Sequence, residues 1–128
     1  MVVEFSSFLK AAKAYLPKLN EKRLNRAYHF AALAHQGQKR KDGSDYITHP
    51  LAAASLLNKL RVDEDTLIAC LLHDVPEETA FTLEDVEKRF GKKVAFLVQG
   101  ITKLSKVHYR HNMEERQIES LKKLFIHS

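Results

Sequence analysis

Apolar residues recur every three or four positions along most of this chain, which is the spacing of one face of an α-helix. The clearest stripe lies between Asn20 and His35, at positions Leu24, Ala27, Tyr28, Ala31 and Ala34. Asn20 is a favourable N-cap, because its side chain can accept a hydrogen bond from an N–H of the first turn. The polar segment 36–45 contains Gly37 and Gly43 and is predicted to be a loop.

Five further helices are predicted after this loop, because the apolar spacing continues between favourable capping residues. In chain order they start near Pro50, Asp65, Thr82, Val94 and Asn112. The second of them, capped by Asp63, holds the most apolar run. It is predicted to end at Val75, because Pro76 disfavours helical backbone in the residue before it. Gly91 is predicted to end the third helix, and residues 105–111 to form a polar and basic connection.

The composition fits one helical domain. A chain of 128 residues has the length of a single domain, and its 45% apolar residues can build a core. Four glycines and three prolines argue against an all-β fold with many turns. The sequence therefore predicts a compact all-α bundle of about six or seven helices over residues 1–128, without an internal repeat or linker.

The net charge, the lack of a long apolar run and the cysteine content limit the possible binding partners and the cellular compartment of this protein. The formal net charge of +5 favours an anionic partner but does not choose between nucleic acid, a nucleotide and no partner. No apolar run approaches the roughly 20 residues that cross a membrane, so no membrane partner is expected. The single cysteine, Cys70, excludes an internal disulfide and a Cys-rich zinc site, and we expect a reducing cytoplasm.

The strongest candidate for chemistry is the end of the most apolar helix, where His73, Asp74, Glu77 and Glu78 follow one another closely. A helix C-terminus disfavours anions, and residues 62–87 contain no Lys or Arg that would compensate the carboxylates. A divalent cation would remove both penalties, and a set of His and carboxylate suits Mn²⁺, Fe²⁺ or Zn²⁺. The alternative is a helix end whose charges are simply solvated.

His49 is the candidate third ligand. It stands beside Pro50 at the predicted start of the preceding helix. If these two successive helices pack antiparallel, the start of one lies beside the end of the other, and His49 can meet His73 and Asp74. The alternative for His49 is a capping or hydrogen-bonded histidine. His29 and His35 are expected to be surface and capping groups.

The segment Lys39–Lys41 is a candidate anion-binding loop. An arginine such as Arg40 can form a forked contact with a phosphate or stack on a ring. The alternative is an ordinary solvated loop. A basic loop before His49 and an acidic segment after a buried helix together suit a metal-held nucleotide that carries phosphates.

Four segments in order resemble the N-terminal HD domain of RelA/SpoT-type proteins, the bacterial enzymes that make and hydrolyse (p)ppGpp. They are FAALAHQGQKRK at 30–41, YITHPL at 46–51, LLHDVPEET at 71–79 and FG…VQGITKL at 90–104. The likeness runs from about Leu24 to the end of the sequence. It implies an all-helical domain that hydrolyses the 3′-pyrophosphate of (p)ppGpp with Mn²⁺, releasing pyrophosphate and GDP or GTP.

The resemblance also assigns roles to individual residues. It makes His49, His73 and Asp74 metal ligands, and it makes Glu77 and Glu78 the acidic pair that handles the attacking water.

The resemblance assigns the substrate contacts to Arg40, which would stack on guanine, and to Lys41, which would contact the phosphates.

Two departures from the family pattern stand out. Glu78 replaces the usual Asp, and the family's fourth ligand, an Asp in a later "LADRLHN"-like motif, is not reached before Ser128. We therefore expect an incomplete HD domain of a longer parent protein, without its synthetase domain. Because the fourth ligand is not reached, we also expect this chain to hydrolyse (p)ppGpp poorly or not at all.

Three functions stay open at this point. The first is a (p)ppGpp hydrolase, favoured by His73 and Asp74. The second is a hydrolytically silent HD domain that regulates a (p)ppGpp synthetase, favoured by the absence of the fourth ligand. The third is a basic helical domain that binds nucleic acid, which the even spread of Lys and Arg along the chain argues against.

Overall fold

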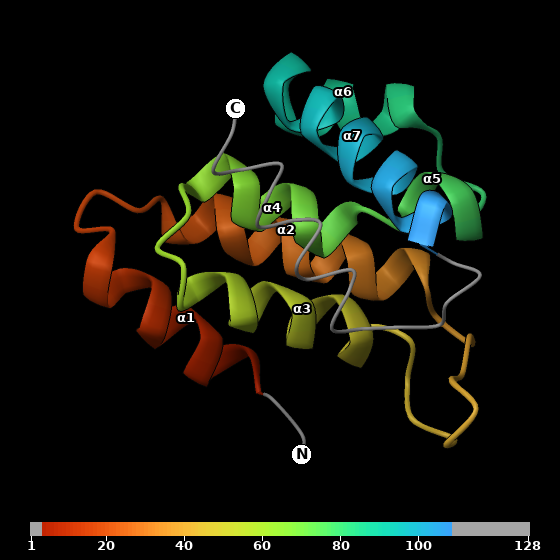
Figure 1. The fold of residues 1–128 in the computed structure, drawn as a ribbon, viewed down its shortest axis with the longest axis horizontal. Helices are drawn as coiled ribbons and strands as arrows, with labels where there is room; N and C mark the ends of the chain where they lie inside the picture. The colour runs from red at the N-terminus through yellow and green to blue at the C-terminus, as the bar shows by residue number, and fades with distance from the viewer. Residues whose placement is uncertain (1–3, 109–128) are drawn as a thin grey trace.

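The computed structural model describes the backbone of residues 4–108 and the side chains of residues 4–104 (Figure 1). This part of the chain is helical, with an isolated β-bridge between Lys39 and Asp45 in place of any strand. Its helices are α1 (Phe5–Tyr15), α2 (Glu21–Ala34), α3 (Thr48–Asn58), α4 (Glu64–Leu72), α5 (Val75–Glu78), α6 (Leu83–Phe90) and α7 (Lys92–His108). The predicted all-α class is confirmed.

Helix α4 is the centre of the bundle. Every residue from Thr66 to Leu72 is buried, and α4 packs against α2, α3 and α7. Helix α1 covers α3 and α2, while α6 packs on α7 (Figure 1). An apolar side chain stabilises the fold by about 1.5–3 kcal/mol when it is fully buried, so a helix that is buried on all sides anchors its neighbours firmly.

Three of the predicted helix starts are confirmed by side-chain caps. Asn20 accepts a hydrogen bond from the backbone N–H of Arg23 at 3.1 Å, and Asp63 accepts one from Thr66 at 3.0 Å. Thr82 begins α6 with a reciprocal capping box. Gly91, at φ 98°, ends that helix in a backbone conformation that only glycine adopts without strain.

Two predicted boundaries are wrong. The helix expected to reach Val75 ends at Leu72, and a new single turn, α5, carries Pro76 in its first turn. Proline is well accommodated there, because the first-turn N–H groups have no partner within the helix. Residues 105–108 are not a connection but the end of α7. The rest of that predicted connection and the helix predicted from Asn112 lie outside the described residues.

Helix α1 was not predicted, although its apolar residues have helical spacing. Phe8 and Ala12 are buried against the bundle. The Tyr15 hydroxyl donates to the Oδ1 atom of Asn58 and lies 2.8 Å from the carbonyl of Val62. These contacts fix the C-terminal end of α3.

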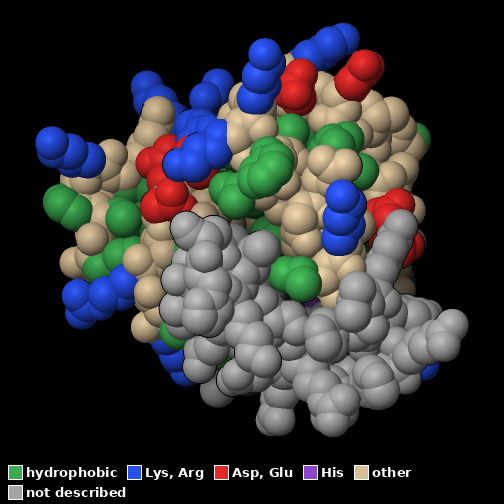
Figure 2. Space-filling model, turned by 45° about the horizontal axis from the view of Figure 1, so that its top comes forward, with side chains coloured by type: hydrophobic (Ala, Val, Ile, Leu, Met, Phe, Trp, Pro, Cys, Tyr) green, Lys and Arg blue, Asp and Glu red, His purple; other side chains and the backbone are tan. Residues whose placement is uncertain are grey.

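One face of the molecule is mixed in charge. On the face drawn in Figure 2, Lys and Arg side chains are scattered among acidic and neutral ones and do not gather in one patch. None of the described helices is both long enough and apolar enough to cross a lipid bilayer.

Candidate metal centre

The break between α4 and α5 sets the direction of two side chains. After Leu72 the backbone hydrogen bond from His73 to the Cys70 carbonyl is long, at 3.4 Å. Asp74 then becomes the N-cap residue of α5. Thr102 of α7 donates to the carbonyl of His73 at 2.9 Å. The side chain of Asp74 makes no capping hydrogen bond to α5, although Asp is a favoured N-cap. Its carboxylate instead faces α3.

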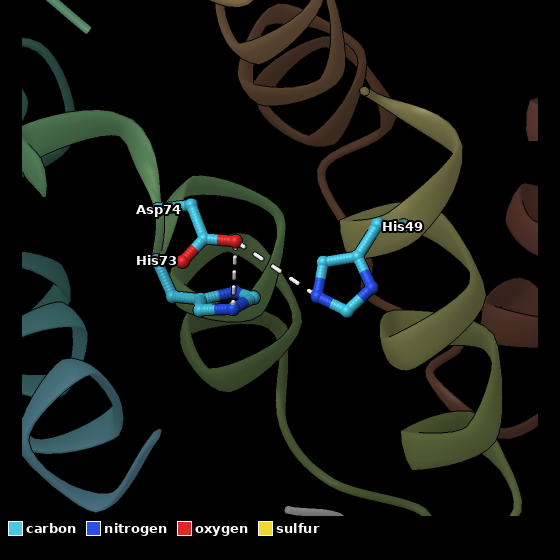
Figure 3. A group of neighbouring side chains, drawn as sticks. All are labelled: His49, His73 and Asp74. Carbon is cyan, nitrogen blue, oxygen red and sulfur yellow. Dashed lines mark ion pairs between the residues drawn. The ribbon is translucent and has the colours of Figure 1, made fainter. Parts of the chain in front are cut away.

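Three side chains meet between α3 and the end of α4 (Figure 3). The Oδ2 atom of Asp74 lies 3.3 Å from Nε2 of His73 and 3.9 Å from Nε2 of His49. One ligand atom from each residue lies within 4.8 Å of the others. Within the described part of the chain, this is the one group of three such residues. The start of α3 and the end of α4 meet as the sequence predicted.

A hydrogen bond determines which nitrogen of His73 faces the cluster. Its Nδ1 lies 2.6 Å from the carbonyl oxygen of Cys70, which can only accept, so Nδ1 carries the proton. In the neutral imidazole, Nε2 then presents a lone pair toward the Asp74 carboxylate. Two acceptors 3.3 Å apart repel each other unless a cation lies between them, either a proton or a metal ion.

The donor set fits a divalent metal ion. Two ligands at about 2.1 Å from one ion can be at most about 4.2 Å apart, and both measured Nε2–Oδ2 distances are shorter than this. The side chains of His49 and Asp74 are 16% and 17% exposed, so the cluster is partly open to solvent. The negative end of the α4 dipole adds to the preference for a cation.

The sequence did not reveal the role of Tyr46. Its hydroxyl donates to Oδ2 of Asp74 at 2.8 Å. Burial, and then the charge of Asp74, raise the pKa of Tyr46, so the hydroxyl keeps its proton. The only signal in the sequence is its position three residues before His49, in the segment that carries the family resemblance.

His35 caps its helix, as expected, but it does not lie on the surface. It follows α2 and its backbone caps that helix, but the residue is only 2% exposed. Its ring stacks on the ring of Tyr46 at 4.5 Å between centroids, with 26° between the planes. Its Nδ1 lies 3.0 Å from Oε1 of Gln38. The ring of His35 therefore packs against one face of the Tyr46 ring.

The basic loop between α2 and α3 has an ordered backbone. The N–H of Arg40 donates to the carbonyl of Ser44 at 2.8 Å, and Gly43 donates back to Arg40 at 2.9 Å. Arg40 is half-buried, and its charge acts on the Tyr46 hydroxyl. Lys41 is exposed. The structure thus brings Arg40 into the electrostatic range of the cluster, whereas nothing ties Lys41 to it.

The acidic pair follows the cluster directly. Glu77 and Glu78 belong to the single turn α5 and are both exposed. The charge of Glu78 also acts on the hydroxyl of Tyr46. Gln38 donates to the backbone carbonyl of Glu78 at 2.6 Å, which ties the basic loop to α5.

The comparison with known families supports what this geometry indicates. A family model described as the HD domain matches residues 27–127. The chain belongs to the HD domain family.

Similar proteins indicate which type of HD domain this is. This HD domain is 45% identical over 122 residues to the bifunctional (p)ppGpp synthase/hydrolase SpoT of Escherichia coli K12, covering 95% of the chain and 17% of that protein. It is 46% identical over 105 residues to a GTP pyrophosphokinase of Streptomyces coelicolor, covering 82% of the chain and 12% of the relative.

A third relative is named guanosine-3′,5′-bis(diphosphate) 3′-pyrophosphohydrolase and comes from Aquifex aeolicus. The identity is 46% over 103 residues, covering 80% of the chain and 14% of the relative. These relatives confirm an HD domain of the RelA/SpoT type. The chain spans less than a fifth of the length of each of these three relatives.

Proposed function

We propose that this HD domain is a Mn²⁺-dependent hydrolase that removes the 3′-pyrophosphate of (p)ppGpp and releases GDP or GTP. The observation that carries the proposal is the position of His73 Nε2, which lies 3.3 Å from the Asp74 carboxylate with His49 beside them, while Nδ1 is held by the Cys70 carbonyl. This arrangement needs a cation, and the named relatives act on the same class of nucleotide.

In the proposed site, His49, His73 and Asp74 hold the ion. A bound divalent ion lowers the pKa of water and neutralises charge on the pyrophosphate. Glu77 and Glu78 would accept the proton of the attacking water, a role that their place within one helical turn of Asp74 supports. The hydrogen bond from Gln38 to the Glu78 carbonyl holds that turn in place.

Arg40 and Lys41 would bind the substrate. A guanidinium can stack on the guanine ring or fork onto a phosphate, and an ammonium is a mobile point charge that suits phosphates. Arg40 is half-buried near Tyr46, which favours a fixed contact such as stacking on guanine. Lys41 is exposed, which favours a mobile contact with the phosphates.

A silent HD domain that regulates a (p)ppGpp synthetase is the second candidate. Glu78 favours it, because the additional methylene relative to the Asp of the family pattern displaces the carboxylate by about one bond length, and misplacement of this order can cost roughly 100-fold in rate. The mixed charge of the surface in Figure 2 gives no corresponding support to nucleic-acid binding.

Product analysis tests the proposal. The chain is incubated with ppGpp and Mn²⁺, and nucleotides are separated by anion-exchange chromatography. We expect slow release of GDP and pyrophosphate in equal amounts, with no product when EDTA is present or when the Asp74→Asn variant replaces the wild type. Binding of ppGpp without turnover would favour the silent domain, and equal turnover by Asp74→Asn would refute the proposed site.

A further inference from the structure

The contact between Tyr46 and Asp74 has a consequence for the metal centre. We propose that Tyr46 is a positioning residue, whose hydroxyl holds Oδ2 of Asp74 toward His49 and His73. The tyrosine ring is in turn held by His35. This inference rests on the proposed metal function of the three ligands and adds a residue that determines how well they bind.

Asp74 needs a partner to keep its orientation. An Asp at the N-cap ordinarily turns toward the backbone N–H of the second or third helical residue. In α5 the second residue is Pro76, which has no N–H, and the carboxylate makes no capping bond. The hydroxyl of Tyr46, at 2.8 Å, supplies a donor on the side of α3. The carboxylate is thereby turned away from its own helix and toward the imidazoles.

Tyr46 can do this because its ring is fixed. On one face the ring stacks on His35, which is only 2% exposed. The backbone N–H of Tyr46 donates to the carbonyl of Gln38 at 3.1 Å, and the Gln38 side chain contacts His35. A donor that is already ordered loses little conformational entropy when it forms its hydrogen bond. The carboxylate therefore stays aligned before an ion arrives.

The buried edge of His35 supports a packing role for its ring. Its Nε2 atom is buried and has no hydrogen-bond partner among the described residues. A buried nitrogen without a hydrogen bond lowers the stability of the fold, and an apolar ring at this position would not have this disadvantage. The residue compensates through the Nδ1 contact with Gln38 and through the stack on Tyr46.

One oxygen can serve both the tyrosine and an ion. The two oxygens of a carboxylate offer about four lone-pair sites. The hydroxyl of Tyr46 uses one site of Oδ2, while the histidine nitrogens lie 3.3 and 3.9 Å from the same atom. Hydrogen bonds to a ligating carboxylate orient it, and losing such a partner typically weakens metal binding by about 10–100-fold.

The test is a Mn²⁺ titration followed by electron paramagnetic resonance, in which the signal of the free aqueous ion reports the unbound fraction. Four chains are compared: wild type, Tyr46→Phe, Asp74→Asn and Tyr15→Phe. Tyr15→Phe is the matched control, because it also removes a hydrogen-bonded tyrosine hydroxyl but at the opposite end of α3. Thermal unfolding of each chain in EDTA measures folding without metal.

We expect Tyr46→Phe to bind Mn²⁺ about 10–100-fold more weakly than wild type, with a melting temperature in EDTA close to that of Tyr15→Phe. Tyr15→Phe should keep the wild-type affinity. The visible absorption of bound Co²⁺ should also change in Tyr46→Phe, because its shape depends on the coordination geometry, and it should be unchanged in Tyr15→Phe.

The outcomes separate the two proposals. Wild-type affinity in Tyr46→Phe, together with loss of binding in Asp74→Asn, would overturn the positioning role and leave the metal centre intact. Equal binding, or no binding, by wild type and Asp74→Asn would refute the metal centre and the positioning role with it. A Tyr46→Phe chain that does not unfold cooperatively in EDTA would assign the hydroxyl to folding and would also overturn the inference.

Discussion

At the scale of single residues, the centre depends on which atoms are already occupied. The Nδ1 of His73 is used by the Cys70 carbonyl, and the carbonyl of His73 itself is used by Thr102. The atom that is left, Nε2, points at Asp74. A ligand whose other groups are satisfied in this way keeps its tautomer and orientation, which raises its affinity for a metal.

Arg40→Ala should separate substrate binding from folding. Removing the guanidinium is expected to weaken binding of guanine nucleotides by at least about 10-fold, since one charge-assisted contact contributes about 1.5–3 kcal/mol. The free energy of unfolding should change by no more than about 0.5 kcal/mol, because the side chain lies in a loop and not in the core. Calorimetric titration with ppGpp and urea denaturation measure the two quantities.

The matched control for this substitution is Arg26→Ala, which removes an exposed arginine from α2. It should leave nucleotide binding unchanged. A fall of several kcal/mol in the stability of Arg40→Ala, or equal losses of binding in both variants, would show that Arg40 has no specific role in binding.

Some roles at this scale could not be read from the sequence. His49, His73 and Asp74 stood out because each occupies a predicted helix end, and helix ends meet when successive helices pack antiparallel. Tyr46 stood at no predicted helix end, and His35 was expected only as a surface or capping group. Their roles arise from a ring stack between residues eleven positions apart and from a hydrogen bond across the bundle. Only the folded chain creates those contacts.

At the scale of helices, the three side-chain caps were predictable from the sequence, whereas two helix boundaries were not. Asn20, Asp63 and Thr82 start their helices as their side chains indicated, because capping is a contact between near neighbours. Pro76 is compatible with ending one helix and with starting another, so the sequence alone did not choose. Packing against α7, including the bond from Thr102, accompanies the earlier break.

The cap at Asp63 should make stability depend on pH in acid. Burial raises the pKa of Asp63, but hydrogen bonds from Thr66 and the charge of Lys93 outweigh it and leave the pKa below its ordinary value. A carboxyl whose pKa is depressed by folding stabilises the fold above its unfolded pKa of about 3.9. That contribution is lost as the pH falls through the folded value.

The Asp63→Asn variant tests this dependence, because Asn caps equally well but does not titrate. We expect wild type to be more stable by up to about 1 kcal/mol at pH 7, from the charge near the helix N-terminus. The difference should shrink toward zero below about pH 4. Urea denaturation at pH 7, 5 and 3.5 measures it, and a difference that does not vary with pH would contradict the explanation.

At the scale of the whole molecule, contacts at both ends of α3 fix its position. Tyr15 of α1 bonds to its C-terminal end, and the cluster joins its N-terminal end to α4 and α5. Arg23 of α2 connects a further pair of helices, reaching the α4 carboxylate of Asp65 at 2.6 Å and the carbonyl of Phe90 at 2.8 Å. A ligand that binds the cluster therefore bridges helices that the bundle already holds side by side.

Metal binding should consequently stabilise the whole fold. An ion that binds only the native chain adds about 2.7 kcal/mol at a concentration 100 times its dissociation constant. For a chain of this length, that corresponds to a rise of roughly 10 °C in melting temperature. Mn²⁺ should produce this rise in wild type, as followed by circular dichroism, and should produce none in Asp74→Asn.

Ca²⁺ distinguishes a specific centre from general charge neutralisation. A hard ion that prefers six to eight oxygen ligands gains little from two imidazole nitrogens and one carboxylate. We expect Ca²⁺ at the same concentration to raise the melting temperature far less than Mn²⁺, because only Asp74 offers it a suitable atom in the cluster. If Ca²⁺ stabilised the chain as much as Mn²⁺, the ions would be acting on the exposed carboxylates, such as Glu77 and Glu78, and the nitrogen ligands of His49 and His73 would have no part in binding.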